Sequence, residues 1–346
     1  MESILITGVC GFIGYHLAHR LLEEGSHVVG IDNMNPYYEV ALKKSRLSLL
    51  EESQGFSFVR GDLGNRPLVE GVFEKNRFET VVHLAAQAGV RYSLVDPYIY
   101  AERNITSLLP LLEGCRKREV RHLLFASSSS VYGEHGSMPR EGNAFAARAF
   151  SAHDSVDHPV SLYAATKRAG ELICHSYAAF AGLPVTALRF FTVYGPWGRP
   201  DMACYRFTRL ILEGRPIDMY NFGKMRRDFT YIDDIVEGVV RIMSKPPVCD
   251  PSWKDSRPDP ATSAAPFRVF NIGRGKPVEL LRFVEIIEKE LGKKALKNFI
   301  PIQPGDVTET FADTGDLTRV TGFAPEVPLE EGIRRFIRWY SEYHGV

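Results

Sequence analysis

The stretch Ser3-Ile4-Leu5-Ile6-Thr7-Gly8-Val9-Cys10-Gly11-Phe12-Ile13-Gly14 decides the fold class of this chain. Ser3–Thr7 is rich in aliphatic and β-branched residues and predicts a buried strand, and a helical pattern follows over Phe12–Glu24. Gly8, Gly11 and Gly14 occupy the turn between them, where the missing side chains let a pyrophosphate approach the backbone. The helix N-terminus then offers free N–H groups and a positive dipole end. The stretch therefore predicts a dinucleotide-binding βα unit.

Short apolar runs alternate with helical patterns through the rest of the first half. Such alternation predicts parallel strands joined by right-handed helical crossovers, and so an α/β fold with a Rossmann-type doubly wound parallel sheet. The expected strands are His27–Asp32, Phe56–Arg60, Thr80–Leu84, His122–Ala126 and Pro184–Arg189, and the expected helices are Ile105–Arg118 and Tyr163–Ala181.

After about Pro196 the segments become shorter and richer in proline, glycine and aromatic residues. The proline-rich residues 245–266 predict a long loop. We therefore expect a dinucleotide-binding domain over 1–195 and a smaller α/β lobe over 196–346, mainly for substrate, with crossings of the chain between the two. Expected elements of the second lobe are a strand at Val269–Ile272 and helices at Val278–Leu291 and Leu329–His344.

The composition argues against several classes of function. Lys plus Arg is 42 and Asp plus Glu is 42, so the chain lacks the basic excess typical of nucleic-acid binders. The cysteines number five, are widely spaced and form no CxxC, which argues against a disulfide framework or a metal site and favours a reducing compartment. No segment is apolar enough for a signal peptide or a membrane span. We expect a cytoplasmic protein without nucleic-acid or membrane partners.

An acidic residue at the end of the second strand indicates the cofactor. Asp32 is placed to accept hydrogen bonds from the adenosine ribose hydroxyls and to repel a 2′-phosphate, which favours NAD over NADP. Asp62 follows the third strand, and two interpretations stay open: it faces the adenine, or it caps the next helix. His83 is expected to be a packed core residue. Further expected cofactor contacts are Phe12, Ile13, Asn33, Leu63, Leu84, Ala85 and Ala86.

Tyr163-Ala164-Ala165-Thr166-Lys167 is a Y-x-x-x-K motif on a predicted helix, with the phenol and the ammonium on one face. Lys167, together with the positive nicotinamide of bound NAD⁺, is expected to lower the tyrosine pKa from about 10, so that the phenolate takes a proton from a sugar hydroxyl. Upstream, Ser127-Ser128-Ser129-Ser130-Val131-Tyr132-Gly133 places four hydroxyls at a strand end. Buried hydroxyls need partners, and a substrate hydroxyl and carboxylate would supply them.

Taken together, these motifs resemble the extended short-chain dehydrogenase/reductases, the NAD-dependent epimerase/dehydratase family. Longer strings at 83–93, 157–167, 189–202 and 226–231 are similar to UDP-glucuronate 4-epimerases, and the resemblance covers nearly the whole chain. It implies tightly bound NAD, a C-terminal UDP-sugar lobe and a homodimer. It also implies that UDP-glucuronate and UDP-galacturonate interconvert at C4 through a transient 4-keto sugar, which rotates and presents its other face.

Carried over by position, the resemblance makes Tyr163 the catalytic base, Lys167 its partner and Ser128 the group that bonds the substrate O4. A 4-keto uronic acid is a β-keto acid, so an epimerase must hold the carboxylate in a geometry that resists loss of CO₂. The residues that the resemblance assigns to that carboxylate are Ser129, Ser130 and Thr192.

Two arginines are expected at the substrate. Arg199 would reach the sugar, unless it caps its own loop, and Arg227 would meet the diphosphate with a charge-assisted hydrogen bond, unless it pairs with Asp228. Weaker candidates for substrate contact are Gln87, Arg91 and Asp306, and Asn104, placed among the cofactor residues, is expected to order the site through backbone contacts.

Related activities differ at the residues before Val131-Tyr132-Gly133. Sugar 4,6-dehydratases need an Asp-Glu pair there and UDP-glucuronate decarboxylases a Glu, whereas this chain has Ser129 and Ser130. UDP-glucose/UDP-galactose 4-epimerase is the alternative enzyme, although it usually has Asn at the position of Thr192. A non-catalytic NAD-binding protein is the alternative from another class, and the presence of both motif residues, Tyr163 and Lys167, counts against it.

The segment Arg140–Ser151 is longer than the family pattern and lies between the serine cluster and Tyr163. It is either a lid or a surface insertion. We favour the insertion, because added surface residues cost little free energy.

Overall fold

The computed structural model describes residues 2–133, 148–254, 256, 258–303 and 305–346. Its centre is a seven-stranded sheet in the order β10-β6-β5-β4-β1-β2-β3, and every neighbouring pair is parallel. This confirms the predicted Rossmann-type doubly wound fold. The strands are β1 (Ser3–Thr7), β2 (His27–Asp32), β3 (Phe56–Arg60), β4 (Thr80–His83), β5 (His122–Ser128), β6 (Val185–Phe190) and β10 (Phe267–Ile272).

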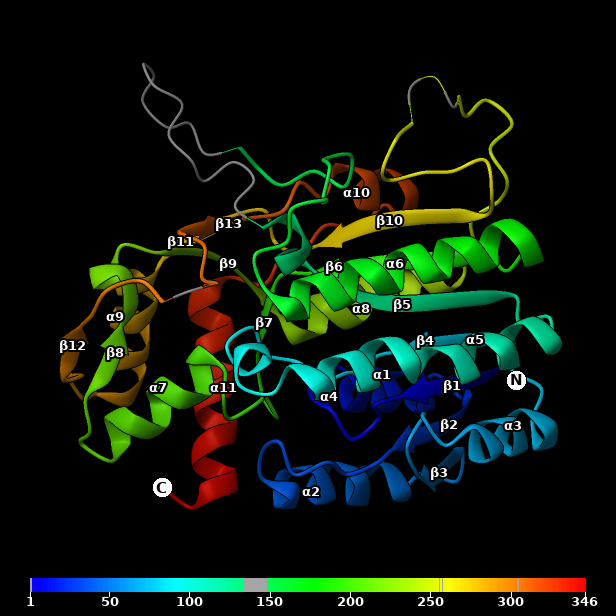
Figure 1. Cartoon of the computed structure of the whole chain (residues 1–346). Coiled ribbons are helices and arrows are strands. Elements are labelled where there is room, and N and C mark those ends of the chain that lie inside the picture. Colours follow the sequence, from blue (N-terminus) through cyan, green and yellow to red (C-terminus); the bar gives the residue numbers. More distant parts are fainter. Residues whose placement is uncertain (1, 134–147, 255, 257, 304) are drawn as a thin grey trace.

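Helices cover both faces of this sheet, as Figure 1 shows. The buried side chains form one apolar cluster on each face, which is why the central strands read as nearly continuous apolar runs. No helix in the described part of the chain is long and apolar enough to cross a bilayer. One face carries α1 (Phe12–Glu23), α2 (Val40–Glu51) and α8 (Ile232–Met243), and the other α3 (Arg66–Lys75), α5 (Leu108–Lys117) and α6 (Leu162–Ala181), with the short α4 (Pro97–Ala101) beside α6.

A smaller lobe lies beside the carboxyl ends of the central strands (Figure 1). Strand β9 is its centre and pairs with β7, β11 and β13, while β8 pairs with β12. The strands are β7 (Thr192–Tyr194), β8 (Ile217–Met219), β9 (Arg226–Tyr231), β11 (Pro277–Glu279), β12 (Lys297–Phe299) and β13 (Glu309–Thr310), and the helices are α7 (Ala203–Leu212), α9 (Leu280–Leu291) and α11 (Leu329–His344).

The second half of the chain returns to the central sheet. Strand β10 pairs with β6 from Phe267 opposite Val185 to Ile272 opposite Phe190. Helix α8 packs against α1, and α10 (Gly315–Thr321) packs against β10. Residues beyond 195 therefore build part of both lobes, and the division of the chain at 195/196 stays a prediction.

Two helices begin later than the sequence predicts. The helix expected over Val278–Leu291 begins at Leu280, because residues 277–279 pair with β9 as an antiparallel strand. The helix expected from Ile105 begins at Leu108. Before it, the backbone N–H of Ser107 donates to the Glu102 carbonyl, 2.9 Å away and five residues earlier, which makes a π-helical turn.

A buried ion pair ties α6 to the sheet. Arg189 on β6 donates to both carboxylate oxygens of Glu171 on α6, each at 2.9 Å, and both side chains are fully buried. Ser127 Oγ, on β5, donates to Glu171 at 2.5 Å, and Arg189 also donates to the Tyr132 phenol at 3.0 Å. Burial alone would raise the pKa of Glu171, but Arg189 holds it below its usual value. This network fixes α6 against β5 and β6.

We expect Glu171→Gln to lower the free energy of unfolding by roughly 3–5 kcal/mol, because it leaves Arg189 buried without its counter-charge. The urea midpoint measures the change. Glu70→Gln is the control, because its pair with Arg66 lies at the surface and should matter little. Equal midpoints for the Glu171 variant and the wild type would contradict the structural role of the pair.

Candidate active site

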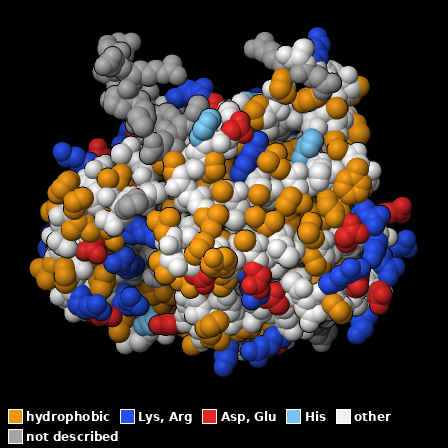
Figure 2. All heavy atoms as spheres, viewed as in Figure 1, with side chains coloured by type: hydrophobic (Ala, Val, Ile, Leu, Met, Phe, Trp, Pro, Cys, Tyr) orange, Lys and Arg blue, Asp and Glu red, His pale blue; other side chains and the backbone are white. Residues whose placement is uncertain are grey.

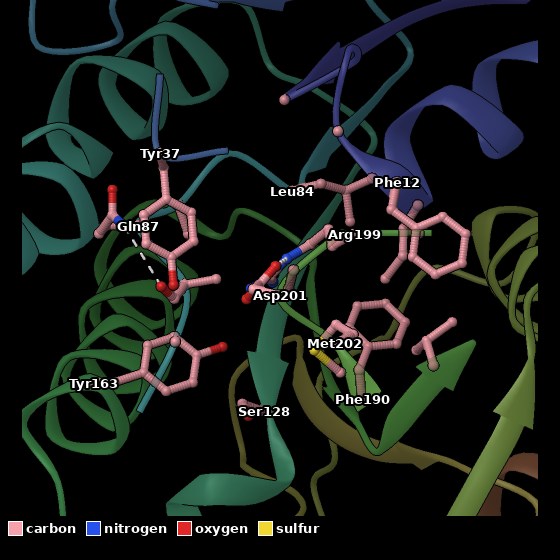
Figure 3. Close-up of a pocket in the computed structure, with 18 of the residues that line it drawn as sticks. Phe12, Tyr37, Leu84, Gln87, Ser128, Tyr163, Phe190, Arg199, Asp201 and Met202 are labelled. Atoms are coloured by element: carbon pink, nitrogen blue, oxygen red, sulfur yellow. Dashed lines mark hydrogen bonds and ion pairs between the residues drawn. The ribbon is translucent and has the colours of Figure 1, made fainter. Parts of the chain in front are cut away.

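A cavity of about 730 Å³ opens at the carboxyl ends of β1, β2, β4 and β5 and extends to the smaller lobe. Doubly wound sheets bind their ligands at this edge. Every residue that the sequence assigns to cofactor or substrate lines the cavity, except Asn104. Figure 3 shows side chains from both lobes pointing into this one space.

The glycine turn is packed so closely that side chains cannot enter it. Gly8 has φ +72°, and a Cβ there would lie 2.8 Å from the backbone N of Ala85. A Cβ at Gly14 would lie 2.3 Å from the Gly8 carbonyl oxygen, and one at Gly11 would lie 2.9 Å from it. Helix α1 has no side-chain cap and no acidic residue in its first turn, so its N–H groups are left for an anion. This cradle fits the pyrophosphate of NAD.

The two acidic residues expected at the cofactor both line the cavity. Asp32 is buried, and its two oxygens accept the backbone N–H groups of Cys10 at 3.1 Å and Met34 at 2.8 Å. These two bonds orient the carboxylate and leave lone pairs free for ribose hydroxyls.

Asp62 does not cap the following helix, so that interpretation is wrong. The cap of α3 is Asn65, whose side chain accepts from the Leu68 N–H. Asp62 instead accepts from the Asn33 side chain at 2.8 Å and pairs with Arg103. It therefore lies at the cavity wall beside Asn33, and its contact with adenine stays a prediction.

Tyr163, the predicted catalytic base, stands in the first turn of α6. Ser161 caps this helix by accepting from the Ala164 N–H at 3.2 Å. In Figure 3 the Tyr163 phenol points into the cavity on the side of Ser128. Burial raises the pKa of Tyr163, and the Ser128 hydroxyl and the Arg199 charge oppose that rise. The predicted lowering of this pKa by Lys167 and bound NAD⁺ is therefore not seen in the protein alone, and it stays a prediction for the holoenzyme.

Lys167 is held beneath the cavity by the strand rather than by the phenol. Its Nζ donates to the Ala126 carbonyl of β5 at 2.7 Å, and burial lowers its pKa to about 8. The lysine is thus fixed on the same face of α6 as Tyr163, at the end of β5.

All four serines, Ser127 to Ser130, line the cavity, but their hydrogen bonds differ. The Ser127 hydroxyl donates its hydrogen bond to Glu171, a partner that the sequence did not indicate. Ser128 accepts from the Ser130 backbone N–H at 3.2 Å, and both line the cavity with Ser129. The hydroxyls of Ser128, Ser129 and Ser130, at the end of β5 and in the turn after it, are therefore in position to face a ligand.

Arg227 meets the cavity without a carboxylate partner among the described residues. Its guanidinium donates to the carbonyls of Val307 at 2.6 Å and Thr308 at 3.1 Å, and burial lowers its pKa to about 10. The expected alternative of a pair with Asp228 is wrong, because Asp228 is buried and accepts backbone N–H groups, that of Ala312 among them at 3.0 Å. A partly buried cation of this kind fits an anionic ligand.

Other arginines at the cavity are paired. Arg199 forms a two-pronged pair with Asp201 at 3.0 and 2.5 Å, within its own loop. Arg91 pairs with Asp306 at 2.7 Å, which joins the loop after β4 to the smaller lobe. The contacts of Arg199, Arg91, Asp306 and Gln87 with substrate stay predictions.

Asn104 lies behind the cavity wall, and its contact with the cofactor stays a prediction. Its side chain exchanges hydrogen bonds with the backbone of Gln87, at 2.8 and 3.0 Å, and donates to Thr166 at 3.0 Å. The expected backbone role is confirmed. His83 is likewise confirmed as a core residue, buried with its Nδ1 2.8 Å from Thr7 Oγ1.

Of the segment 140–151, residues 140–147 lie outside the described residues. Its end is anchored, because Phe150 stacks on Tyr132 with ring centroids 4.7 Å apart. Whether the segment is a lid or an insertion stays open.

The comparisons with known proteins agree with this geometry. A model described as the NAD dependent epimerase/dehydratase family matches residues 4–252. The chain belongs to this family. The prediction of the family is confirmed, and the family's description names its NAD dependence.

Relatives of the chain within the family carry specific names. A probable UDP-glucuronate 4-epimerase of Rhizobium meliloti is 47% identical over 344 residues, which cover 98% of this chain and 96% of the relative. UDP-glucuronate 4-epimerase 1 of Arabidopsis thaliana is 46% identical over 349 residues, with 99% and 77% covered. A solved structure of UDP-glucuronic acid 4-epimerase from Bacillus cereus, in complex with UDP-glucuronic acid and NAD, has 33% identity, a TM-score of 0.84, and coverage of 99% and 100%.

Sequence reasoning missed several residues of this family member's cavity, among them Asn35, Tyr37 and Lys43. All three follow β2. The position of Asp32 at the carboxyl end of that strand was a usable signal, because the next residues must leave the sheet at the same edge.

We expect Gly14→Ala to weaken NAD binding by at least about tenfold, because the new Cβ would displace the turn that holds the pyrophosphate. Titration with NAD measures it. Gly71→Ala on α3 is the matched control, since a Cβ there meets nothing within 4 Å. Unchanged affinity of the Gly14 variant would show that the turn does not bind the cofactor.

Proposed function

We propose that the protein is an NAD-dependent UDP-glucuronate 4-epimerase, which interconverts UDP-glucuronate and UDP-galacturonate through a transient 4-keto sugar. The observation that carries the proposal is the arrangement of one cavity in which Tyr163 and Ser128 meet further hydroxyls at Ser129, Ser130 and Thr192. The names of the relatives support the same substrate.

The chain's own residues perform the proton transfer and hold the sugar. NAD, when bound at the glycine turn and Asp32, supplies reversible hydride acceptance at the sugar C4. Tyr163 takes the proton of the C4 hydroxyl and later returns it, and Ser128 bonds the same oxygen. Lys167, fixed on the Ala126 carbonyl, adds positive charge below the phenol.

The carboxylate must be held because the 4-keto uronate loses CO₂ when its C5–C6 bond aligns with the carbonyl π system. Ser129 and Ser130 lie in the 3-10 turn that follows β5, and Thr192 begins β7 in the smaller lobe. Hydroxyls from two sides would fix the rotation of the carboxylate. Arg227, partly buried and without a carboxylate partner among the described residues, is suited to the diphosphate.

The test is incubation with UDP-glucuronate and catalytic NAD⁺, followed by anion exchange and NMR. We expect a mixture of UDP-glucuronate and UDP-galacturonate without net NADH, and a loss of rate by about 10²–10⁴ in Tyr163→Phe. Tyr177→Phe is the control, because this phenol bonds Glu113 outside the cavity. UDP-pentose with CO₂ would contradict the proposal, and turnover of UDP-glucose or UDP-galactose alone would favour the alternative epimerase. NAD binding without any turnover would favour the non-catalytic reading.

We also propose that the protein forms a homodimer through α4, α5 and α6. Figure 2, which has the view of Figure 1, shows hydrophobic side chains spread over the face where these helices lie. Tyr98 on α4 is 85% exposed, Leu172 on α6 53% and Phe180 on α6 66%. Exposed apolar side chains gathered on packed helices are typical of a protein interface.

We expect Leu172→Glu combined with Phe180→Glu to yield a monomer, because buried carboxylates would oppose the association. Sedimentation equilibrium measures the mass. Val248→Glu is the control, since Val248 is 79% exposed on the loop after α8. The homodimer through this face is refuted by a double variant that still sediments with twice the mass of the chain.

A further inference from the structure

Tyr37 brings a second phenol to the sugar end of the cavity. It lies in residues 33–39, the connection between β2 and α2, directly after Asp32. In Figure 3 its ring points from this loop toward Tyr163 and lies between Gln87 and Asp201. One connection therefore reaches from the expected ribose site to the catalytic tyrosine.

Hydrogen bonds within the loop fix the position of Tyr37. The Tyr37 backbone N–H donates to the Asn35 side chain at 2.6 Å, and the Asn35 N–H donates to the Asn33 side chain at 3.0 Å. Lys43 on α2 donates to the Asn35 carbonyl at 2.8 Å. The two successive asparagine turns and the Lys43 hydrogen bond fix the backbone of this loop. The position of the Tyr37 phenol is therefore determined by the fold.

The loop after β4 leaves room for the end of the phenol. Gly89 has φ +104°, and a Cβ there would lie 2.4 Å from the Tyr37 Oη. Tyr100 donates to the Gly89 carbonyl at 2.6 Å, which holds that backbone in place, and the Tyr92 ring lies 5.2 Å from the Tyr37 ring. The absence of a side chain at Gly89 therefore lets Tyr37 stand at the cavity wall.

The Tyr37 hydroxyl has no hydrogen-bond partner among the residues that the structure describes, although the side chain is partly buried. Burial raises its pKa, so the phenol remains a neutral donor at physiological pH. The Arg199 guanidinium lies 5.9 Å from the ring centroid. A fixed donor without a partner in the described part of the chain, beside the Arg199–Asp201 pair and the Tyr163 phenol, points to a ligand oxygen.

We propose that Tyr37 contacts the sugar on the side facing Tyr163 and closes this end of the cavity, so that the 4-keto intermediate is retained until it is reduced again. This inference rests on the proposed epimerase function. It assigns to the β2–α2 loop a role in retaining the substrate, in addition to the loop's expected place beside the cofactor.

Loss of retention has a defined chemical outcome. A 4-keto sugar that escapes would already have lost a hydride from C4 and a proton from O4, and the hydride would stay on the enzyme as NADH. In solution its C5–C6 bond breaks, CO₂ leaves, and the electron pair moves to C5, which takes a proton from water. The products are UDP-4-keto-pentose, CO₂ and an enzyme in the reduced form.

The holoenzyme with UDP-glucuronate tests this in two variants. We expect Tyr37→Ala to raise NADH formation and UDP-4-keto-pentose, relative to epimerised product, by at least about tenfold. Tyr37→Phe keeps the ring and removes the donor, so we expect a raised KM with little escape. NADH absorbance and mass spectrometry give the readouts, and thermal melting checks the fold.

Tyr177→Phe is the control for loss of a phenol outside the cavity. The inference is overturned if both Tyr37 variants keep the wild-type KM and the wild-type ratio of keto-pentose to epimerised product. A wild-type protein that leaves UDP-glucuronate unchanged would contradict the proposed function itself, and this inference with it, and the two failures are therefore distinguishable.

Discussion

The buried pair of Glu171 and Arg189 is the interaction on which the site depends. It fixes α6 against β5 and β6, and Lys167 and Tyr163 stand about one and two turns earlier on the same helix. The bond from Lys167 to the Ala126 carbonyl then fixes the helix start against the end of β5. The pair thereby helps to keep the Tyr163 phenol on the side of Ser128. A buried pair of charges is expensive to desolvate, and this one is satisfied by further hydrogen bonds.

The anion-binding groups of the cavity lie at its two ends. The glycine turn offers uncapped N–H groups at one end, and Arg227 offers a cation without a carboxylate partner among the described residues at the other. Two further arginines at the cavity are paired, Arg199 with Asp201 in its own loop and Arg91 with Asp306 of the smaller lobe. An elongated ligand with phosphates and a carboxylate meets donors along its length, while the chain as a whole stays neutral.

Much of the fold was predictable because it rests on local patterns. The strand–turn–helix at Gly8–Gly14, the alternation of the first half and the closing helix Leu329–His344 are all present. The rest depends on partners distant in sequence. Nothing local shows that Ser127 would meet Glu171, or that residues 277–279 would pair with β9 and delay the next helix. The cavity residues that belong to contiguous sequence motifs were predictable from the sequence. Tyr37 was missed because only tertiary packing brings it near Tyr163.

A crystal structure of the holoenzyme with UDP-glucuronate tests the central claim most directly, namely that hydroxyls from both lobes hold the sugar for chemistry at C4. The account predicts the sugar O4 between the Tyr163 and Ser128 hydroxyls and the carboxylate within hydrogen-bond distance of Ser129, Ser130 and Thr192. A carboxylate bound elsewhere, with O4 turned away from Tyr163, would contradict it.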